Sequence, residues 1–161
     1  MSFLSPENIN QVAPYKVTRV DDMSVSFVTL DGVRYLIGFF HDIFVVDKDG
    51  YYLYVVDQDT PQRKDPLVAQ TIIAIIEDFF NHVSRSAVLY ICDVNDKKQA
   101  LRARLFSGWF NTADDNSKYT LNTYQNQDDK GVVYYYGLIL RRDNPEHDEI
   151  VQIFYDFLAE H

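Results

Sequence analysis

Cysteine is almost absent from this sequence, because Cys92 is the only one in 161 residues. A single thiol cannot form an internal disulfide, which suits a protein of the reducing cytosol. Long hydrophobic runs are also lacking, since Ile72–Ile76 is far shorter than the roughly 18 apolar residues of a membrane span. The opening segment MSFLSPENINQVAPY has no basic stretch followed by an apolar run, so we find no secretory signal. These absences predict a cytoplasmic protein without a membrane partner.

Basic residues are scarce relative to acidic ones. The chain has 15 Lys and Arg against 24 Asp and Glu, which gives a net charge of −9 at pH 7. Binding to a phosphate backbone needs clustered cations, so the composition argues against a nucleic-acid partner. Hydrophobic residues make up 47% of the chain and aromatic residues 15%, which is enough for a folded core. We expect one domain over residues 1–161, with residues 1–14 as a loosely ordered lead-in.

The first third of the chain has the pattern of an antiparallel meander. Apolar and polar residues alternate along part of Ser24–Leu30, as in a half-buried strand. Asp31-Gly32 and Asp49-Gly50 are two-residue turn signals between successive strands. The sequence therefore predicts five strands here, at Tyr15–Val20, Ser24–Leu30, Val33–Phe40, Ile43–Val46 and Tyr51–Val56.

Two helices and a buried strand follow the meander. The first helix begins after Asp65 as its N-cap, with Pro66 in the first turn, where a missing N–H costs nothing. The strand Ala87–Cys92 is apolar on both faces, which indicates that both are covered. Asp96 then caps a second helix, which Gly108 closes.

A hairpin and a last helix complete the chain. Lys118–Tyr124 and Val132–Arg141 are the predicted hairpin strands, and Asn144 caps a final helix that Pro145 opens. The fold class is therefore α/β (α+β), with a mixed, largely antiparallel sheet and three helices. The predicted order of elements is β-β-β-β-β-α-β-α-β-β-α.

The segment DVNDKKQALRARLFSGWF and the order of elements over Ser24–Arg141 resemble the later part of the GCN5-related acetyltransferase (GNAT-like) fold. In that family Asn is followed by Ala, then Leu-Tyr, then Gly-Phe. Ala100 and Gly108 fit this spacing, and Trp109 stands where Phe is usual. The resemblance implies an acyl-CoA site between the Tyr51–Val56 and Ala87–Cys92 strands, with acetyl-CoA as the cofactor.

The chain also resembles an uncharacterised bacterial family of small proteins without an assigned function. The similarity lies in the VLYIC strand, the DP…TIIAIIEDFF helix and the RRDNP turn. This second resemblance implies no activity.

The coenzyme A loop of the acetyltransferases is not matched. That loop, Gln/Arg-x-x-Gly-x-Gly/Ala, presents backbone N–H groups to the pyrophosphate at a helix N-terminus. The corresponding run Gln62–Val68, QRKDPLV, keeps no glycine in either register and contains Pro66, which has no N–H. The tyrosine that often protonates the leaving thiolate aligns with Arg104, or with Leu105 in the shifted register. The resemblance therefore implies a degenerate acetyltransferase-like fold.

Five polar residues near the ends of elements form a candidate ligand site. Arg63 and Lys64 precede a helix N-terminus, which could hold an anion, but solvated linker charges explain them as well because Asp65 already caps the helix. Cys92 ends a strand of a mixed sheet, where ligands often bind, although nothing in the sequence brings a His near its thiol. The candidate ligand-binding residues are Gln62, Arg63, Lys64, Cys92 and Asp93.

Patterns for catalysis and metal binding are lacking. No pair of His residues has zinc spacing. Asp47, Asp49 and Gly50 resemble the start of a calcium loop, but the downstream ligands are absent and a turn explains them. We therefore predict no catalytic residue and no metal site.

Tyrosine is unusually abundant, with 12 in the chain, and three of them are consecutive in the predicted hairpin. A tyrosine offers a large apolar body with a polar tip, which suits interfaces, whereas cross-strand packing in the sheet is the alternative explanation. We interpret the chain as a non-catalytic interaction module, with itself as a homodimer or another protein as partner. The alternative is an acyl-CoA-binding N-acetyltransferase-like protein with a non-standard pyrophosphate loop. The candidate interface residues are Tyr134, Tyr135 and Tyr136.

Overall fold

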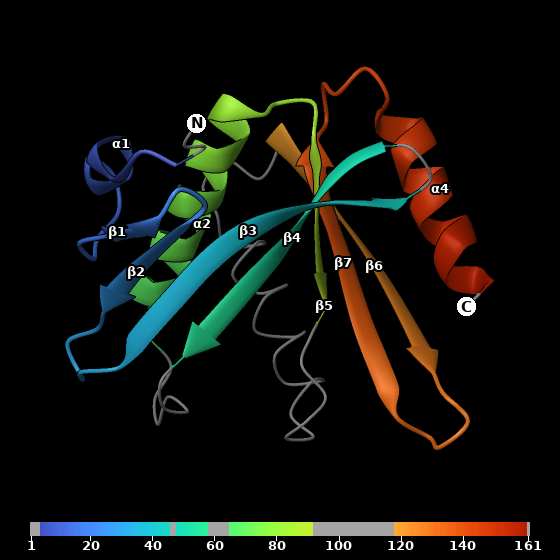
Figure 1. Ribbon diagram of the computed structural model, residues 1–161, viewed down its shortest axis with the longest axis horizontal. Coiled ribbons are helices and arrows are strands. Elements are labelled where there is room, and N and C mark those ends of the chain that lie inside the picture. The colour runs from blue at the N-terminus through green and yellow to red at the C-terminus, as the bar shows by residue number, and fades with distance from the viewer. Residues whose placement is uncertain (1–3, 46–47, 58–64, 92–117, 161) are drawn as a thin grey trace. The chain divides into compact units, whose positions relative to one another are not determined.

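A computed structural model describes residues 4–45, 48–57, 65–91 and 118–160 of the chain (Figure 1). Its seven strands form one sheet in the order β1-β2-β3-β4-β5-β7-β6. Strands β4 and β5 pair in parallel, and the other pairs of known register are antiparallel. The helices are α1 (Pro6–Asn10), α2 (Pro66–His82) and α4 (His147–Ala159), and the strands are β1 (Thr18–Asp21), β2 (Ser24–Val28), β3 (Arg34–Val45), β4 (Lys48–Asp57), β5 (Ala87–Ile91), β6 (Tyr119–Gln127) and β7 (Val133–Arg141).

The predicted fold class is confirmed: a mixed, largely antiparallel sheet with three helices. The three described helices are α2 and α4, which were predicted, and α1, which was not. The helix predicted after Asp96 lies outside the described residues. Helix α1 falls in the segment expected to be a loose lead-in. Leu4 and Ile9 are each only 1% exposed there, so this segment is packed against the rest of its unit.

The meander has four strands where the sequence predicted five. The two ranges Val33–Phe40 and Ile43–Val46 belong to the single strand β3, whose described end is Val45. The prediction of a turn at Asp49-Gly50 was wrong, because Gly50 lies inside β4 and pairs with Ala87. Only Gly32 and Gly131 among the described glycines have positive φ, at 83° and 82°. An Asp-Gly pair therefore marks a turn at Gly32, while Gly50 is extended because it pairs within the sheet.

The chain divides into two compact units, Met1–Phe40 with Leu53–Ser84 and His41–Tyr52 with Arg85–His161. The expectation of one domain stays a prediction. In the first unit the Asp65 side chain caps α2 by accepting the Leu67 N–H at 2.9 Å, as predicted. The same carboxylate accepts the Tyr15 hydroxyl at 2.5 Å. Burial and this bond raise the pKa of Tyr15.

The second unit packs α4 against the β6–β7 hairpin and β5 (Figure 1). Gly137 is opposite Tyr90 in the β5–β7 register, and a Cβ on Gly137 would lie only 2.0 Å from the Tyr90 ring. Because Gly137 has no side chain, the Tyr90 ring can pack against β7 at this position. The buried residues that join the helix to the sheet are Ala87, Leu89, Leu138, Leu140, Ile150, Phe154 and Leu158.

Candidate functional site

The structure describes the candidate interface residues predicted from the sequence, but not the candidate ligand-binding residues. The candidate ligand-binding residues Gln62, Arg63, Lys64, Cys92 and Asp93 all lie outside the described residues, so that site stays a prediction. The candidate interface residues Tyr134–Tyr136 lie in β7, in the middle of the second unit. The β6–β7 hairpin is therefore the candidate site that the structure describes.

The three tyrosines of β7 are half-buried and lie on both faces of the hairpin. Tyr136 packs beside the core beneath α4 and pairs directly with Tyr124 of β6, so part of its surface serves cross-strand packing. Tyr134 is on the same face, and its hydroxyl donates to Asp128 Oδ2 at 3.2 Å. Tyr135 faces the other side. Each tyrosine keeps some exposure, which leaves part of its surface available to a partner.

Strand β6 is the last strand of the sheet, and two bonds fix which way its amide groups point. The Arg142 N–H donates to the Lys118 carbonyl at 2.8 Å, and the Asp128 N–H donates to the Val132 carbonyl at 2.9 Å. Bonded and non-bonded pairs alternate along an antiparallel ladder, so the even-numbered residues of β6 bond to β7. The odd-numbered residues direct N–H and C=O away from β7, where no described strand pairs with them. These outward residues include Leu121, Thr123, Gln125 and Gln127.

Features that normally protect an edge strand are missing from β6. Natural edges are usually short, charged, bulged or interrupted by proline. Strand β6 has nine residues, YTLNTYQNQ, with no charge and no proline. Its register with β7 is continuous from Tyr119↔Arg141 to Gln127↔Val133. Thr123, Gln125 and Gln127, whose amide groups point outward, are exposed residues, so a strand can approach this edge from solvent.

The other edge of the sheet is protected. Strand β1 has only four residues, TRVD, two of which are charged. Its register with β2 shifts between Arg19 and Asp21. Of the two edges formed by the described strands, β6 is therefore the one suited to strand addition.

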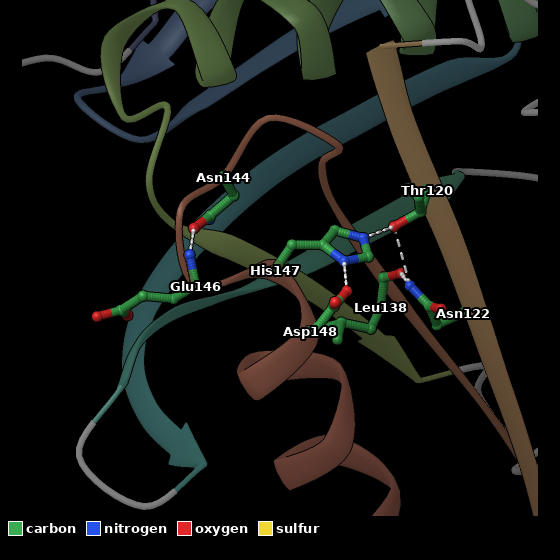
Figure 2. A network of polar contacts seen from close by, with 7 residues as sticks. All are labelled: Thr120, Asn122, Leu138, Asn144, Glu146, His147 and Asp148. Carbon is green, nitrogen blue, oxygen red and sulfur yellow. Dashed lines mark hydrogen bonds and ion pairs between the residues drawn. The ribbon is translucent and has the colours of Figure 1, made fainter.

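A polar network joins the start of α4 to β6 (Figure 2). The His147 Nε2 atom lies 2.8 Å from Thr120 Oγ1, and His147 Nδ1 lies 2.9 Å from Asp148 Oδ1. The Asn122 amide donates to the Thr120 hydroxyl at 3.1 Å. A proton on Nδ1 satisfies all three contacts, because Nδ1 then donates to the carboxylate and Nε2 accepts the Thr120 hydroxyl. No local sequence pattern predicted this network, because strand order brings its members together.

The chemistry of this network favours a tether over a catalytic site. A hydroxyl, a ring nitrogen and a carboxylate in this order resemble a nucleophile, base and orienting acid. The Asp148 side chain is fully exposed, at 104%, whereas the orienting acid of such a site is buried. Within the described ranges, no three His, Cys, Asp or Glu residues are placed to hold a metal. We therefore interpret the network as a connection that holds α4 on the hairpin.

Helix α4 begins two residues later than predicted. Pro145 lies in a turn, and the helix starts at His147 with Glu146 at the N-cap position and no capping bond from its side chain. Asn144 still acts at this end, because its Oδ1 accepts the Glu146 N–H at 2.9 Å. Its Nδ2 donates to the Arg85 carbonyl at 3.0 Å, which links the turn to the start of β5. This contact across 59 residues explains why a buried Asn is needed there.

Asp128 organises the turn of the hairpin. Its Oδ1 accepts the N–H groups of Lys130 and Val132, both at 2.9 Å. These bonds, led by the one from Val132, hold the pKa of the carboxyl below its ordinary value. A carboxyl with a depressed pKa stabilises the folded turn above its unfolded pKa, and this contribution is lost as pH falls through the folded pKa.

We expect acid to loosen this turn, and NMR can follow the change. The Val132 amide shift should titrate with a midpoint below the ordinary aspartate pKa. An Asp128→Asn variant keeps the acceptor oxygen but cannot titrate, so its Val132 amide should not move in this pH range. A wild-type midpoint at or above the ordinary value would contradict the bonding described here.

Comparisons with known proteins place the chain in a family that has no assigned function. The family model described as "Family of unknown function (DUF6169)" matches residues 64–156, from two residues before α2 to near the end of α4. No curated protein and no solved structure matches the chain. The resemblance to the acetyltransferase fold accordingly stays a prediction. In the described part of the chain, no helix has the length and hydropathy needed to cross a bilayer.

Proposed function

The chain belongs to this family of unknown function, and we propose that it is a non-catalytic interaction module that accepts a β-strand of a partner protein at the outer edge of β6. The tyrosines of β7 flank this edge and form the second part of the proposed interface. The observation that carries the proposal is the row of outward amide groups at Leu121, Thr123, Gln125 and Gln127 on a long, uncharged, regular strand.

Main-chain pairing would supply the affinity of such an interface. A peptide hydrogen bond contributes about 0.5–1.5 kcal/mol net, so a partner that pairs along the outward residues gains several such terms. Strand β6 is already ordered by its pairing with β7, so the conformational entropy lost on binding is mainly that of the partner strand. This favours binding of an extended segment over docking of a folded face.

The tyrosines would add side-chain contacts to the pairing. A strand added at β6 lies about 4.8 Å from β6, next to Tyr124, and about twice that distance from Tyr136. Long aromatic side chains reach diagonal neighbours across this spacing. The Tyr134 hydroxyl already binds Asp128 at the turn, which holds the ring in place. A half-buried tyrosine whose hydroxyl is already bonded, as in Tyr134, suits recognition because it loses little conformational entropy on binding.

The acyl-CoA alternative stays a prediction. It depends on Gln62, Arg63, Lys64, Cys92 and Asp93, and no described residue adds support for it. A cytoplasmic location stays a prediction as well.

Proline at Thr123 tests the proposal with little risk to the fold. The Thr123 N–H points away from β7, so Thr123→Pro removes an outward donor without breaking a bond inside the hairpin. Thr123→Val keeps the donor and a β-branched side chain, and is the matched control. Random short peptides displayed on phage and selected on the full chain serve as the probe.

We expect the selected peptides to bind the wild type and Thr123→Val equally. Binding to Thr123→Pro should fall at least about tenfold, which corresponds to about 1.4 kcal/mol. Selected peptides that bind all three proteins equally would overturn the proposal, and so would a selection that yields no binder.

A further inference from the structure

We propose that the partner strand is β6 of a second copy of this chain, antiparallel to the first, with Thr123 facing Thr123. This inference rests on the proposed function and names its partner. It follows from three observations: the direction of the amide groups, the charges at the two ends of β6, and the protected edge at β1.

The direction of the amide groups restricts how two copies of β6 can pair. Only the odd-numbered residues direct N–H and C=O away from β7, so an odd-numbered residue must face an odd-numbered residue. Antiparallel pairing about the middle of the strand, with the outward residues Leu121, Thr123 and Gln125 of each copy in the ladder, places its central residue on the two-fold axis. That central residue is Thr123, which is odd-numbered and exposed. In this register Leu121 faces Gln125.

The charges at the ends of β6 favour this same register. No residue from Tyr119 to Gln127 is charged, so no like charges meet inside the paired strands. Lys118 precedes the strand and Asp128 follows it, and both are exposed. With Thr123 on the axis, Lys118 of each copy lies opposite Asp128 of the other, which is a favourable cross-strand pair. A chain of net charge −9 repels its own copy overall, so a strand without charged residues is where two copies can meet.

The assembly closes at two copies. Pairing of β6 with itself uses the same surface on both partners and leaves no second copy of that surface exposed. The remaining edge, β1, is short, charged and irregular in register, so it does not continue the sheet. The expected product is therefore a dimer and not a fibre.

Opposite charges at position 123 test the register directly. We expect the full chain to sediment as a dimer at high micromolar concentration. Thr123→Lys and Thr123→Glu should each sediment as monomers, because identical charges then face each other on the axis. An equal mixture of the two variants should regain the dimer mass. Wild-type association should tighten as salt rises, because screening reduces the repulsion between acidic copies.

The outcomes separate this inference from the proposed function. A wild type that stays monomeric, or two charged variants that still dimerise alone, would overturn self-pairing. A charged mixture that fails to dimerise while the wild type does would overturn the register. Peptides that bind the wild type and lose binding to Thr123→Pro would leave the proposed function standing in any of these cases.

Discussion

Replacing Phe79 with alanine is expected to lower the free energy of unfolding by about 3–5 kcal/mol, the usual cost of truncating a buried phenylalanine. The Phe79 side chain in α2 is 0% exposed. Its ring stacks on Phe39 of β3, with centroids 4.1 Å apart and planes within 8°. It also meets the Phe80 ring edge-on at 5.6 Å. Truncation removes both ring contacts and leaves a cavity where helix and strand meet.

Urea unfolding followed by circular dichroism measures this loss, with Phe40→Ala as the matched control. Phe40 is next to Phe39 on β3 but is 53% exposed, so its truncation should cost less than about 1 kcal/mol. The slope of the transition should stay unchanged in both variants if the unfolded surface is the same. Equal losses for Phe79→Ala and Phe40→Ala would contradict the packing of α2 against β3.

Phe154→Ala is the corresponding change in the second unit, and we again expect a loss of about 3–5 kcal/mol. Phe154 is 1% exposed and belongs to the buried cluster between α4, β5 and β7. Its ring also meets Tyr155 edge-on at 5.1 Å, and Tyr155 lies 6.2 Å from Tyr124 of β6. Truncation therefore loosens the helix that supports the proposed interface from behind.

The control for this prediction is on the same helix. Phe157 is 36% exposed, so Phe157→Ala should cost only about 1 kcal/mol. Thermal unfolding compares the two variants under one condition. In Phe154→Ala we also expect the Thr120 and His147 NMR signals to shift, since α4 carries one end of their hydrogen bond. A Phe154→Ala protein as stable as Phe157→Ala would show that α4 is not packed as described.

Local sequence signals predicted the elements whose structure depends on near neighbours. The Asp65 cap and Pro66 at the start of α2 are of this kind, since the cap bond spans only two residues. The turn at Gly32 is another, because positive φ is a property of the residue itself. The hairpin strands agreed to within a few residues for the same reason.

Elements that depend on distant contacts could not be predicted. Helix α1 has only five residues, too few to be stable alone. It is held by the Ser5 N–H, which donates to Asp78 Oδ2 at 2.7 Å across 73 residues. Gly50 is a second example, because its extended form follows from pairing with Ala87, 37 residues later. The residues next to Ser5 and Gly50 in the sequence do not indicate these distant partners.

The candidate site likewise combines a feature that the local sequence predicted with one that depends on distant contacts. The tyrosine run was visible in the sequence, and its placement on both faces of a strand followed from the period of two. The free edge was missed, because strand order places β6 outside β7 and order is not a local property. One signal was available, namely nine strand residues without a charge or proline. Such a run indicates an edge open to pairing once its position in the sheet is known.

Amide hydrogen exchange at single residues of β6 tests the open edge most directly. In dilute solution we expect slow exchange at Asn122 and Tyr124, which bond to β7, and fast exchange at Thr123 and Gln125, which point outward. Raising the protein concentration should slow Thr123 and Gln125 while leaving their even-numbered neighbours nearly unchanged. Slow exchange at Thr123 in the dilute monomer would contradict an open edge at β6, and fast exchange at every concentration would contradict its pairing with a second copy.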